Sequence, residues 1–184
     1  MSRGGLALPS ERDISRFETV VLVHLNSAYN LARWLVRSEH DAQDVVQEAC
    51  LRALRSFETF RGGDGRCWLL TIVRNTCCTW LERNRRDEPE PLVDDDLEQF
   101  ASEDGDPHHQ LIRQVDADRV RAAIDALPAV FREIVVLRDL EGLSYKEIAG
   151  VAAVPIGTVM SRLARARKQL EERLAPEMAR GGLT

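Results

Sequence analysis

Residues 143–163 read LSYKEIAGVAAVPIGTVMSRL, and this stretch decides the fold of the carboxy-terminal half of the chain. Ser144 and Glu147 have the spacing of a capping box, in which each side chain accepts a hydrogen bond from the other residue's backbone amide. A short helix is therefore expected to begin there and to end at a turn around Ala153 and Pro155. A long second helix follows over about 156–174, with apolar residues on one face and polar or cationic residues on another.

A short capped helix, a tight turn and a second helix with a cationic face predict a helix-turn-helix, in which the second helix enters the major groove of DNA. Arginine can hold guanine O6 and N7 with two hydrogen bonds, serine and threonine can contact base edges or phosphates, and lysine suits a phosphate. The candidate contacts are Thr158, Ser161, Arg162, Arg165 and Lys168. On this motif alone, the alternative is an amphipathic helical hairpin with a solvated basic face.

The amino-terminal half also has apolar residues at helical spacing, which predicts helices over 17–37, 41–57 and 67–86. Ser38 and Asp41 fit a capping signature at the start of the second of these. The stretch 61–65, which reads RGGDG, predicts a loop because glycine costs about 1 kcal/mol in a helix interior. Two further helices are expected over 107–127 and 128–140. No alternating strand pattern of useful length occurs, so the predicted fold class is all-α.

The net charge of −5 is unevenly distributed along the chain. Residues 1–86 carry 13 basic and 10 acidic side chains, residues 87–118 carry 1 and 12, and residues 119–184 carry 11 and 8. The middle segment contains Pro89 and Pro91 and has no apolar period, which predicts a flexible linker. We therefore expect two small helical domains, 14–86 and 107–175, joined by an acidic linker over 87–106.

Two parts of the chain, each through several short motifs, resemble the extracytoplasmic-function sigma factors of the sigma-70 family. Residues 143–149 and 155–163 resemble region 4, the promoter-binding domain, while residues 44–49, 60–62 and 68–76 resemble region 2. The two matches occur in the family's order and cover about 14–86 and 107–174. The resemblance implies an alternative sigma factor that binds core RNA polymerase, directs promoter-specific initiation and has no catalytic chemistry of its own. It implies that the second helix of the motif binds the minus-thirty-five element.

The resemblance also implies roles for residues of the first domain. Asp44, Gln47 and Glu48 match the surface that packs against the polymerase clamp helices, although a solvated acidic face explains any one of them. A second set matches the elements that hold the unstacked minus-ten strand: Phe60, Arg61, Gly62, Asp64, Arg66, Arg74 and Asn75. A flipped base needs a pocket with polar edges and a flexible wall, which suits this loop. Trp68 and Trp80 fit the apolar pattern and are expected in the core.

The partners implied by the resemblance are core RNA polymerase, through its β′ clamp helices and β flap, promoter DNA and an anti-sigma factor. The family's linker occupies a basic channel near the RNA exit, which suits the charge of the segment 87–118. Because that segment should repel free DNA, we expect the isolated protein to bind promoter duplex poorly. The sequence departs from the family's usual residues at two positions. Ala153 stands where a glycine often makes the turn, and Met160 stands where a lysine is common. Ala153 either avoids positive φ or strains the turn by about 1 kcal/mol.

Two other classes of function explain less of the sequence. An autonomous helix-turn-helix regulator explains residues 140–174 but leaves the Asp44 surface and the glycine loop without a role. An enzyme is disfavoured because no nucleophile–histidine order, HExxH motif or glycine-rich phosphate loop accompanies the histidines. No cofactor or metal site is expected, and three of the four cysteines fit core or boundary positions. Without an apolar stretch of membrane-spanning length or a secretory signal, the expected location is the cytoplasm.

Overall fold

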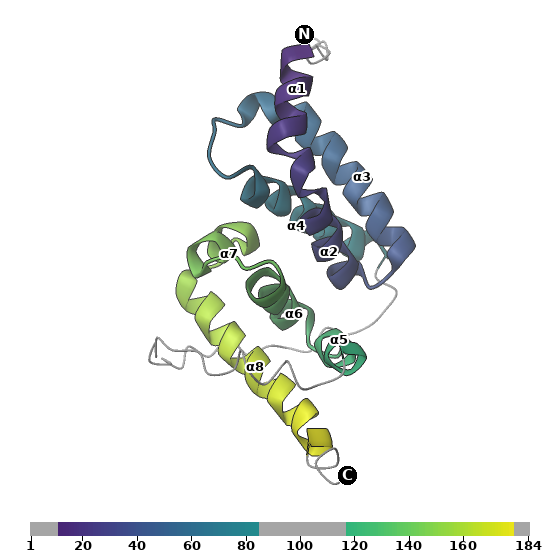
Figure 1. The fold of residues 1–184 in the computed structure, drawn as a ribbon, viewed down its shortest axis with the longest axis vertical. Helices are drawn as coiled ribbons and strands as arrows, with labels where there is room; N and C mark the ends of the chain where they lie inside the picture. Colours follow the sequence, from purple (N-terminus) through teal and green to yellow (C-terminus); the bar gives the residue numbers. More distant parts are fainter. Residues whose placement is uncertain (1–10, 85–116, 179–184) are drawn as a thin grey trace. The chain divides into compact units, whose positions relative to one another are not determined.

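The computed structural model describes residues 11–84 and 117–178, and within these ranges it contains helices and turns but no strand (Figure 1). The predicted all-α class is confirmed. The chain divides into two compact units, one ending at Asn84 and the other beginning at Arg85, and each is described by itself. The predicted linker over 87–106, and the predicted helix start at Asp106 and Pro107, lie outside the described residues.

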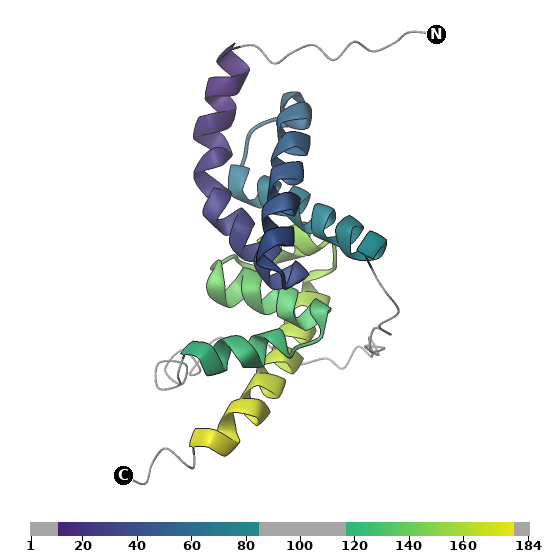
Figure 2. The same cartoon turned by 90° about the vertical axis from the view of Figure 1, so that its right-hand side faces the viewer.

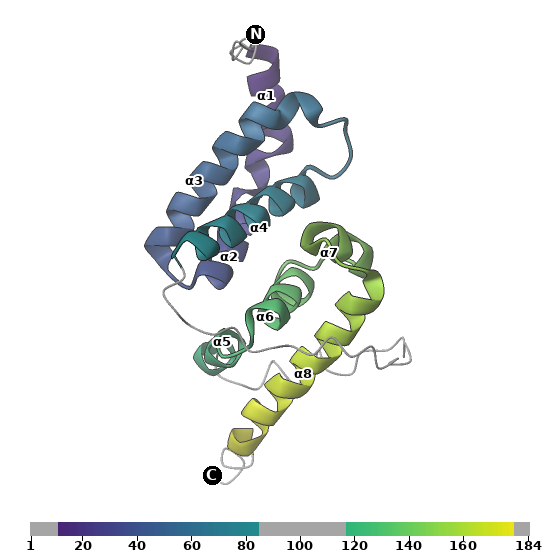
Figure 3. The ribbon, with the colours of Figure 1, turned by 180° about the vertical axis from the view of Figure 1, so that it is seen from behind.

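The first unit is a bundle in which α2, α3 and α4 pack against one another in pairs (Figure 3). Its elements are α1 (Glu11–Val20), η1 (Leu22–His24), α2 (Leu25–Val36), α3 (Glu39–Ser56), η2 (Phe57–Thr59) and α4 (Gly65–Asn84). Ser38 caps α3 by accepting a hydrogen bond from the Asp41 amide at 3.3 Å, as predicted. The core includes the fully buried side chains of Leu31, Leu69 and Val73.

The predicted continuous helix over 17–37 is wrong, because the helix breaks at Val21. A short 3-10 turn, η1, separates α1 from α2, and it shifts the helical register. Val21 is completely buried, whereas Leu25, predicted to lie on the same apolar face, is 36% exposed. Three β-branched valines lie at positions 20, 21 and 23, and such residues lose side-chain freedom in a helix. The run of valines therefore disfavours a continuous helix across this point.

Glycine at the start of α4 permits a close approach between two segments of the first unit. A Cβ atom added to Gly65 would meet the Val20 backbone oxygen and would lie 2.7 Å from the Val20 Cγ1 atom. Gly65 is buried and is the first residue of α4, whereas the predicted loop extended through it. The end of α1 thus packs directly against the first turn of α4, with no room for a side chain between them.

The second unit consists of α5 (Ala117–Asp125), α6 (Ala129–Val135), the π-helical turn η5 (Val136–Leu140), α7 (Tyr145–Ala152) and α8 (Ile156–Met178). Helix α8 packs against α5, α6 and α7 (Figure 2). The predicted helix over 128–140 is present, and Gly142 ends it with a φ of +70°. Its π-helical last turn was not predicted. Among the described residues, no single helix is long and apolar enough to cross a membrane, and only α7 and α8 taken together pass that test, with a bend of 100° between them.

The turn between α7 and α8 contains a non-glycine residue in the left-handed conformation. Ala153 has φ 55° and ψ 43°, and its amide donates to the Ala149 carbonyl oxygen. Of the two alternatives stated for this position, the structure therefore has the strained one. An L-residue in this conformation costs about 1–2 kcal/mol, which glycine avoids.

We predict that Ala153→Gly stabilises the second unit by about 0.5–1 kcal/mol, because relief of the left-handed strain exceeds the added chain entropy of glycine in the unfolded state. Amide hydrogen exchange of α7 and α8 measures this change. The control is Ala122→Gly, at an exposed position in α5, which should lose about 1 kcal/mol. Faster exchange in the Ala153→Gly protein would contradict the prediction.

Candidate nucleic-acid interface

The capping box at the start of α7 has the geometry that the sequence predicts. The Glu147 amide donates to Ser144 Oγ at 3.3 Å, and the Ser144 amide donates to Glu147 Oε2 at 2.7 Å. Ile148, Val151 and Ala152 then turn inward and are buried. Both helices of the motif are thus fixed to the core of the second unit, and the predicted helix-turn-helix is present.

Helix α8 buries one face against this core and leaves another face outward. Val159, Leu163 and Ala166 are at most 2% exposed. The residues classed as exposed over the same part of the helix are Ile156, Gly157, Ala164 and Lys168. Successive exposed residues from Gly157 are seven and four positions apart, so they form one stripe along the helix.

The prediction that Thr158 lies on the outward face of α8 is wrong. Its side chain is only 6% exposed, and its backbone oxygen accepts a hydrogen bond from Ser161 Oγ at 3.1 Å. Thr158 lies next to the buried Val159 in the first turn of α8, where α7 packs against the helix. Arg162 is also turned partly inward, because its Nε atom is buried and has no hydrogen-bond partner among the described residues. Ser161 and Arg165 are half-buried.

Arginines that the sequence analysis did not single out hold the second unit together. Arg167 of α8 forms an ion pair with Asp139 of η5 at 3.0 Å, between side chains that are 29% and 18% exposed. Arg138 donates to the Leu143 carbonyl oxygen at 2.8 Å and lies over the Tyr145 ring, 5.0 Å from its centroid. These bonds join the π-helical turn to both helices of the motif. No spacing rule distinguishes such arginines from those that face outward.

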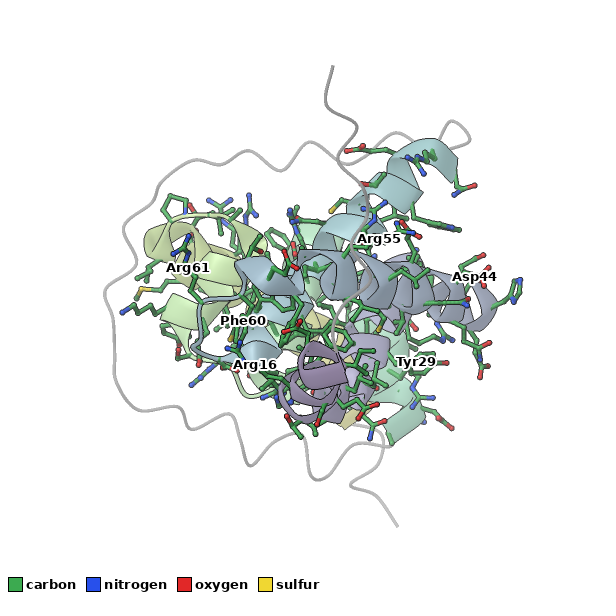
Figure 4. All side chains as sticks on the ribbon, turned by 90° about the horizontal axis from the view of Figure 1, so that it is seen from above. Arg16, Tyr29, Asp44, Arg55, Phe60 and Arg61 are labelled. Carbon is green, nitrogen blue, oxygen red and sulfur yellow. The ribbon has the colours of Figure 1, made fainter. Side chains whose placement is uncertain are left out.

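In the first unit, a cluster of four aromatic rings lies beneath the glycine loop. The Phe60 ring is stacked on Phe57 at 5.8 Å between centroids and lies 5.1 Å from Trp68, and Phe57 also meets Phe17 edge-on at 5.3 Å. Phe60 is 8% exposed, so it forms part of this packed cluster. Trp68 packs against this cluster but is half-buried, as is Trp80, so the prediction that both are core residues holds only in part. Arg16 lies over the Phe57 ring at 5.5 Å, and Figure 4 shows Arg16 and Phe60 on the same side of the unit.

The loop above the cluster contains two glycines in the left-handed conformation and, on either side of them, two exposed residues of opposite charge. Gly62 and Gly63 have φ values of +93° and +105°, which glycine adopts without strain. Arg61 and Asp64 are exposed on either side of them. Of the other candidates for the minus-ten strand, Asn75 is exposed on α4, and Arg66 and Arg74 are half-buried.

Asp64 caps helix α4. Its Oδ1 atom accepts from the Arg66 amide at 2.8 Å, and its Oδ2 atom accepts from the Cys67 thiol at 3.2 Å. Burial raises the pKa of this carboxyl, but the hydrogen bonds from Cys67 and Arg66 and the nearby His24 outweigh that effect, so the pKa lies below its ordinary value. Asp64 therefore stabilises the helix start in its ionised form.

A third surface lies on the outward face of α3. Asp44 and Gln47 are exposed and Glu48 is half-buried, and in Figure 4 the Asp44 side chain points away from the bundle. Arg52 Nε donates to Glu48 Oε1 at 2.8 Å, and this bond lowers the pKa of Glu48 below its ordinary value despite partial burial. Leu51, 43% exposed, lies four positions after Gln47 and three after Glu48. The sequence analysis missed this residue, although it is the large apolar side chain within an otherwise polar helix face.

Comparison with known proteins gives two matches to family models. Sigma-70 region 2 matches residues 20–87, and Sigma-70 region 4 matches residues 117–170. The ECF RNA polymerase sigma factor SigE of Mycolicibacterium smegmatis is 38% identical over 162 residues, which are 86% of this chain and 62% of that protein. The ECF RNA polymerase sigma-E factor of Escherichia coli K12 is 34% identical over 175 residues, which are 91% of each chain.

Two solved structures have a similar fold. The sigma factor RpoE in complex with the anti-sigma factor NepR from Bartonella quintana is 25% identical, with a TM-score of 0.67 over 88% of this chain and 98% of that one. CnrH in complex with the cytosolic domain of CnrY is also 25% identical, with a TM-score of 0.62 over 89% of this chain and 90% of that one.

We predict that Asp64→Asn lowers the stability of the first unit at pH 7 by about 0.5 kcal/mol, because asparagine keeps a cap but lacks the charge that favours a helix start. A carboxyl whose pKa is depressed on folding stabilises the protein above its unfolded pKa and loses that effect as the pH falls through the folded one. The difference between the two proteins should therefore shrink below about pH 4, near the ordinary value of 3.8.

Tryptophan fluorescence during urea unfolding measures this difference selectively, since Trp34, Trp68 and Trp80 are the chain's three tryptophans and all lie in the first unit. The matched control is Glu58→Gln, at an exposed carboxylate in η2 that makes no cap. An Asp64→Asn difference that stays constant from pH 7 to pH 3 would contradict the assignment.

Proposed function

Because the chain belongs to the extracytoplasmic-function group of the sigma-70 family, we propose that it binds core RNA polymerase and directs promoter-specific transcription initiation. One observation carries this proposal: the chain matches both region 2 and region 4, in that order. An autonomous helix-turn-helix regulator requires only the second match. The protein acts by binding, without catalytic chemistry of its own, and it acts in the cytoplasm.

Helix α8 binds the minus-thirty-five element with its outward face. Lys168 is exposed and can reach a phosphate, while Arg165 and Ser161 are half-buried at the flank of the same face. The inward turn of Arg162 leaves its guanidinium tip, beyond the buried Nε atom, as the part that reaches the DNA backbone. The rigid attachment of α7 and α8 to the core supports this role, because base readout requires a helix of fixed orientation.

The glycine loop and the exposed part of α4 hold the unstacked minus-ten strand. Arg61 supplies a cation, and Asn75 supplies an amide that can bond a base edge. Phe60 contributes from below the loop as part of its aromatic support, rather than as a free stacking surface. Asp64 contributes by fixing the end of the loop to α4.

The α3 surface, formed by Asp44, Gln47, Glu48 and Leu51, binds the polymerase clamp helices, and the second unit contacts the β flap. A cluster of carboxylates and amides around one exposed apolar residue has the composition of an interface anchor with a polar rim. An anti-sigma factor that covers polymerase-binding surfaces holds the protein inactive. Both structural neighbours support this last proposal, since each is described in complex with another protein: RpoE with the anti-sigma factor NepR, and CnrH with a domain of CnrY.

We predict that transcripts from the gene's own upstream region depend on this protein when core polymerase is supplied, and that Arg165→Ala with Lys168→Ala reduces them by at least about tenfold. Each lost phosphate contact also reduces the salt dependence of promoter binding by about one unit of slope. Run-off transcription measures the first effect. Arg121→Ala is the control, since it removes an exposed cation from α5. Tight duplex binding by the protein alone, without a transcript, would favour the autonomous regulator instead.

We predict that Asp44→Ala with Gln47→Ala weakens binding to core polymerase by roughly tenfold, while leaving the fold intact because both side chains are exposed. Competition with a labelled sigma factor for core polymerase measures this affinity. Glu82→Ala, at an exposed carboxylate of α4, serves as the control for loss of one negative charge. Equal affinity of the double variant and the control would exclude the α3 surface as the polymerase contact.

A further inference from the structure

The outward face of α8 has a chemistry that its sequence does not suggest. Gly157, Ala164 and Lys168 are exposed, and Met160 and Ser161 lie between them along the helix and are half-buried. The inward face is occupied by Val159, Leu163 and Ala166, so the orientation of the stripe is fixed. Ala164 is therefore the exposed residue in the middle of this stripe, with the half-buried Met160 beside it and the cations Arg165 and Lys168 at its flank and end.

Neither of these two side chains can form a conventional hydrogen bond with a base edge, since alanine has no polar atom and the methionine thioether is at most a weak acceptor. The hydroxyl of Ser161 already donates its hydrogen to the Thr158 carbonyl oxygen at 3.1 Å, so it can only accept a further hydrogen bond. Thr158 itself is enclosed by the protein. Donation of hydrogen bonds to base edges is thus left to the cations at the flank and end of the face.

The major groove offers one apolar group among the four bases, the 5-methyl group of thymine, and alanine is among the side chains that contact it. On the basis of the proposed function, we propose that Ala164, with Met160 beside it, is a specificity-determining residue that recognises a thymine in the minus-thirty-five element through its 5-methyl group. The small Ala164 side chain lets the helix backbone approach the groove closely. Arg165 and Lys168 supply affinity but not this discrimination.

The experiment removes the thymine methyl group and leaves every hydrogen bond in place. A promoter is first selected from randomised DNA by the protein with core polymerase, and each thymine of its minus-thirty-five element, on either strand, is then replaced by deoxyuridine. One replacement should reduce transcription by about fourfold, the effect of losing a buried methyl contact. In the Ala164→Gly protein the same replacement should have no effect, because the partner methyl group is absent.

The control variant is Ala122→Gly, which introduces the same glycine cost in an exposed position of α5 and should retain the fourfold effect. The inference is overturned if the selected element has no thymine, if no replacement changes transcription, or if the Ala164→Gly protein remains as sensitive as the original. In any of these cases, strong transcription from the promoter without deoxyuridine would leave the proposed function unaffected. Failure to select any promoter overturns both.

Discussion

The apolar seam of α8 determines which chemistry the second unit can present. Val159, Leu163 and Ala166 are buried against the neighbouring helices, and burial of such side chains is the main favourable term in holding a helix to its unit. Once this seam is in place, the 3.6-residue period leaves one stripe outward. The face available to DNA is therefore a consequence of core packing rather than an independent feature.

In the first unit, packed aromatic residues likewise determine which residues remain exposed. Phe57, Phe60 and Trp68 pack together beneath the glycine loop, so the loop is supported from below while its own residues remain exposed. Positive φ at Gly62 and Gly63 allows the chain to turn over this cluster, and the Asp64 cap fixes where α4 begins. A loop with a rigid base and exposed polar residues can present them to an unstacked strand without a large ordering cost.

Local rules predicted much of the fold, and packing explains part of what they missed. The cap at Ser38, the capping box at Ser144 and the glycine stop at position 142 depend on residues within one turn of each other, and the structure has them. The burial of Thr158 depends on the helices that pack against α8. The break at Val21 and the π-helical turn before Glu141 are irregularities that helical periodicity alone does not predict. The DNA contacts predicted for α8 follow from residue type, and residue type does not reveal which polar side chain another helix will bury.

Packing within the second unit also affects how many cations of α8 are available to bind DNA. Arg162, Arg165, Arg167, Lys168 and Arg173 give the helix five positive charges in the sequence. Yet Arg167 is paired with Asp139, and Arg173 donates to the Ala126 carbonyl oxygen at 3.2 Å, so two of the five hold α8 to the rest of the unit. Because Asp139 neutralises the charge of Arg167, the electrostatic contribution to the proposed DNA binding is smaller than the charge count implies. A helix with fewer phosphate contacts depends more on base contacts for its selectivity, which gives the apolar centre of its outward face a larger share of recognition.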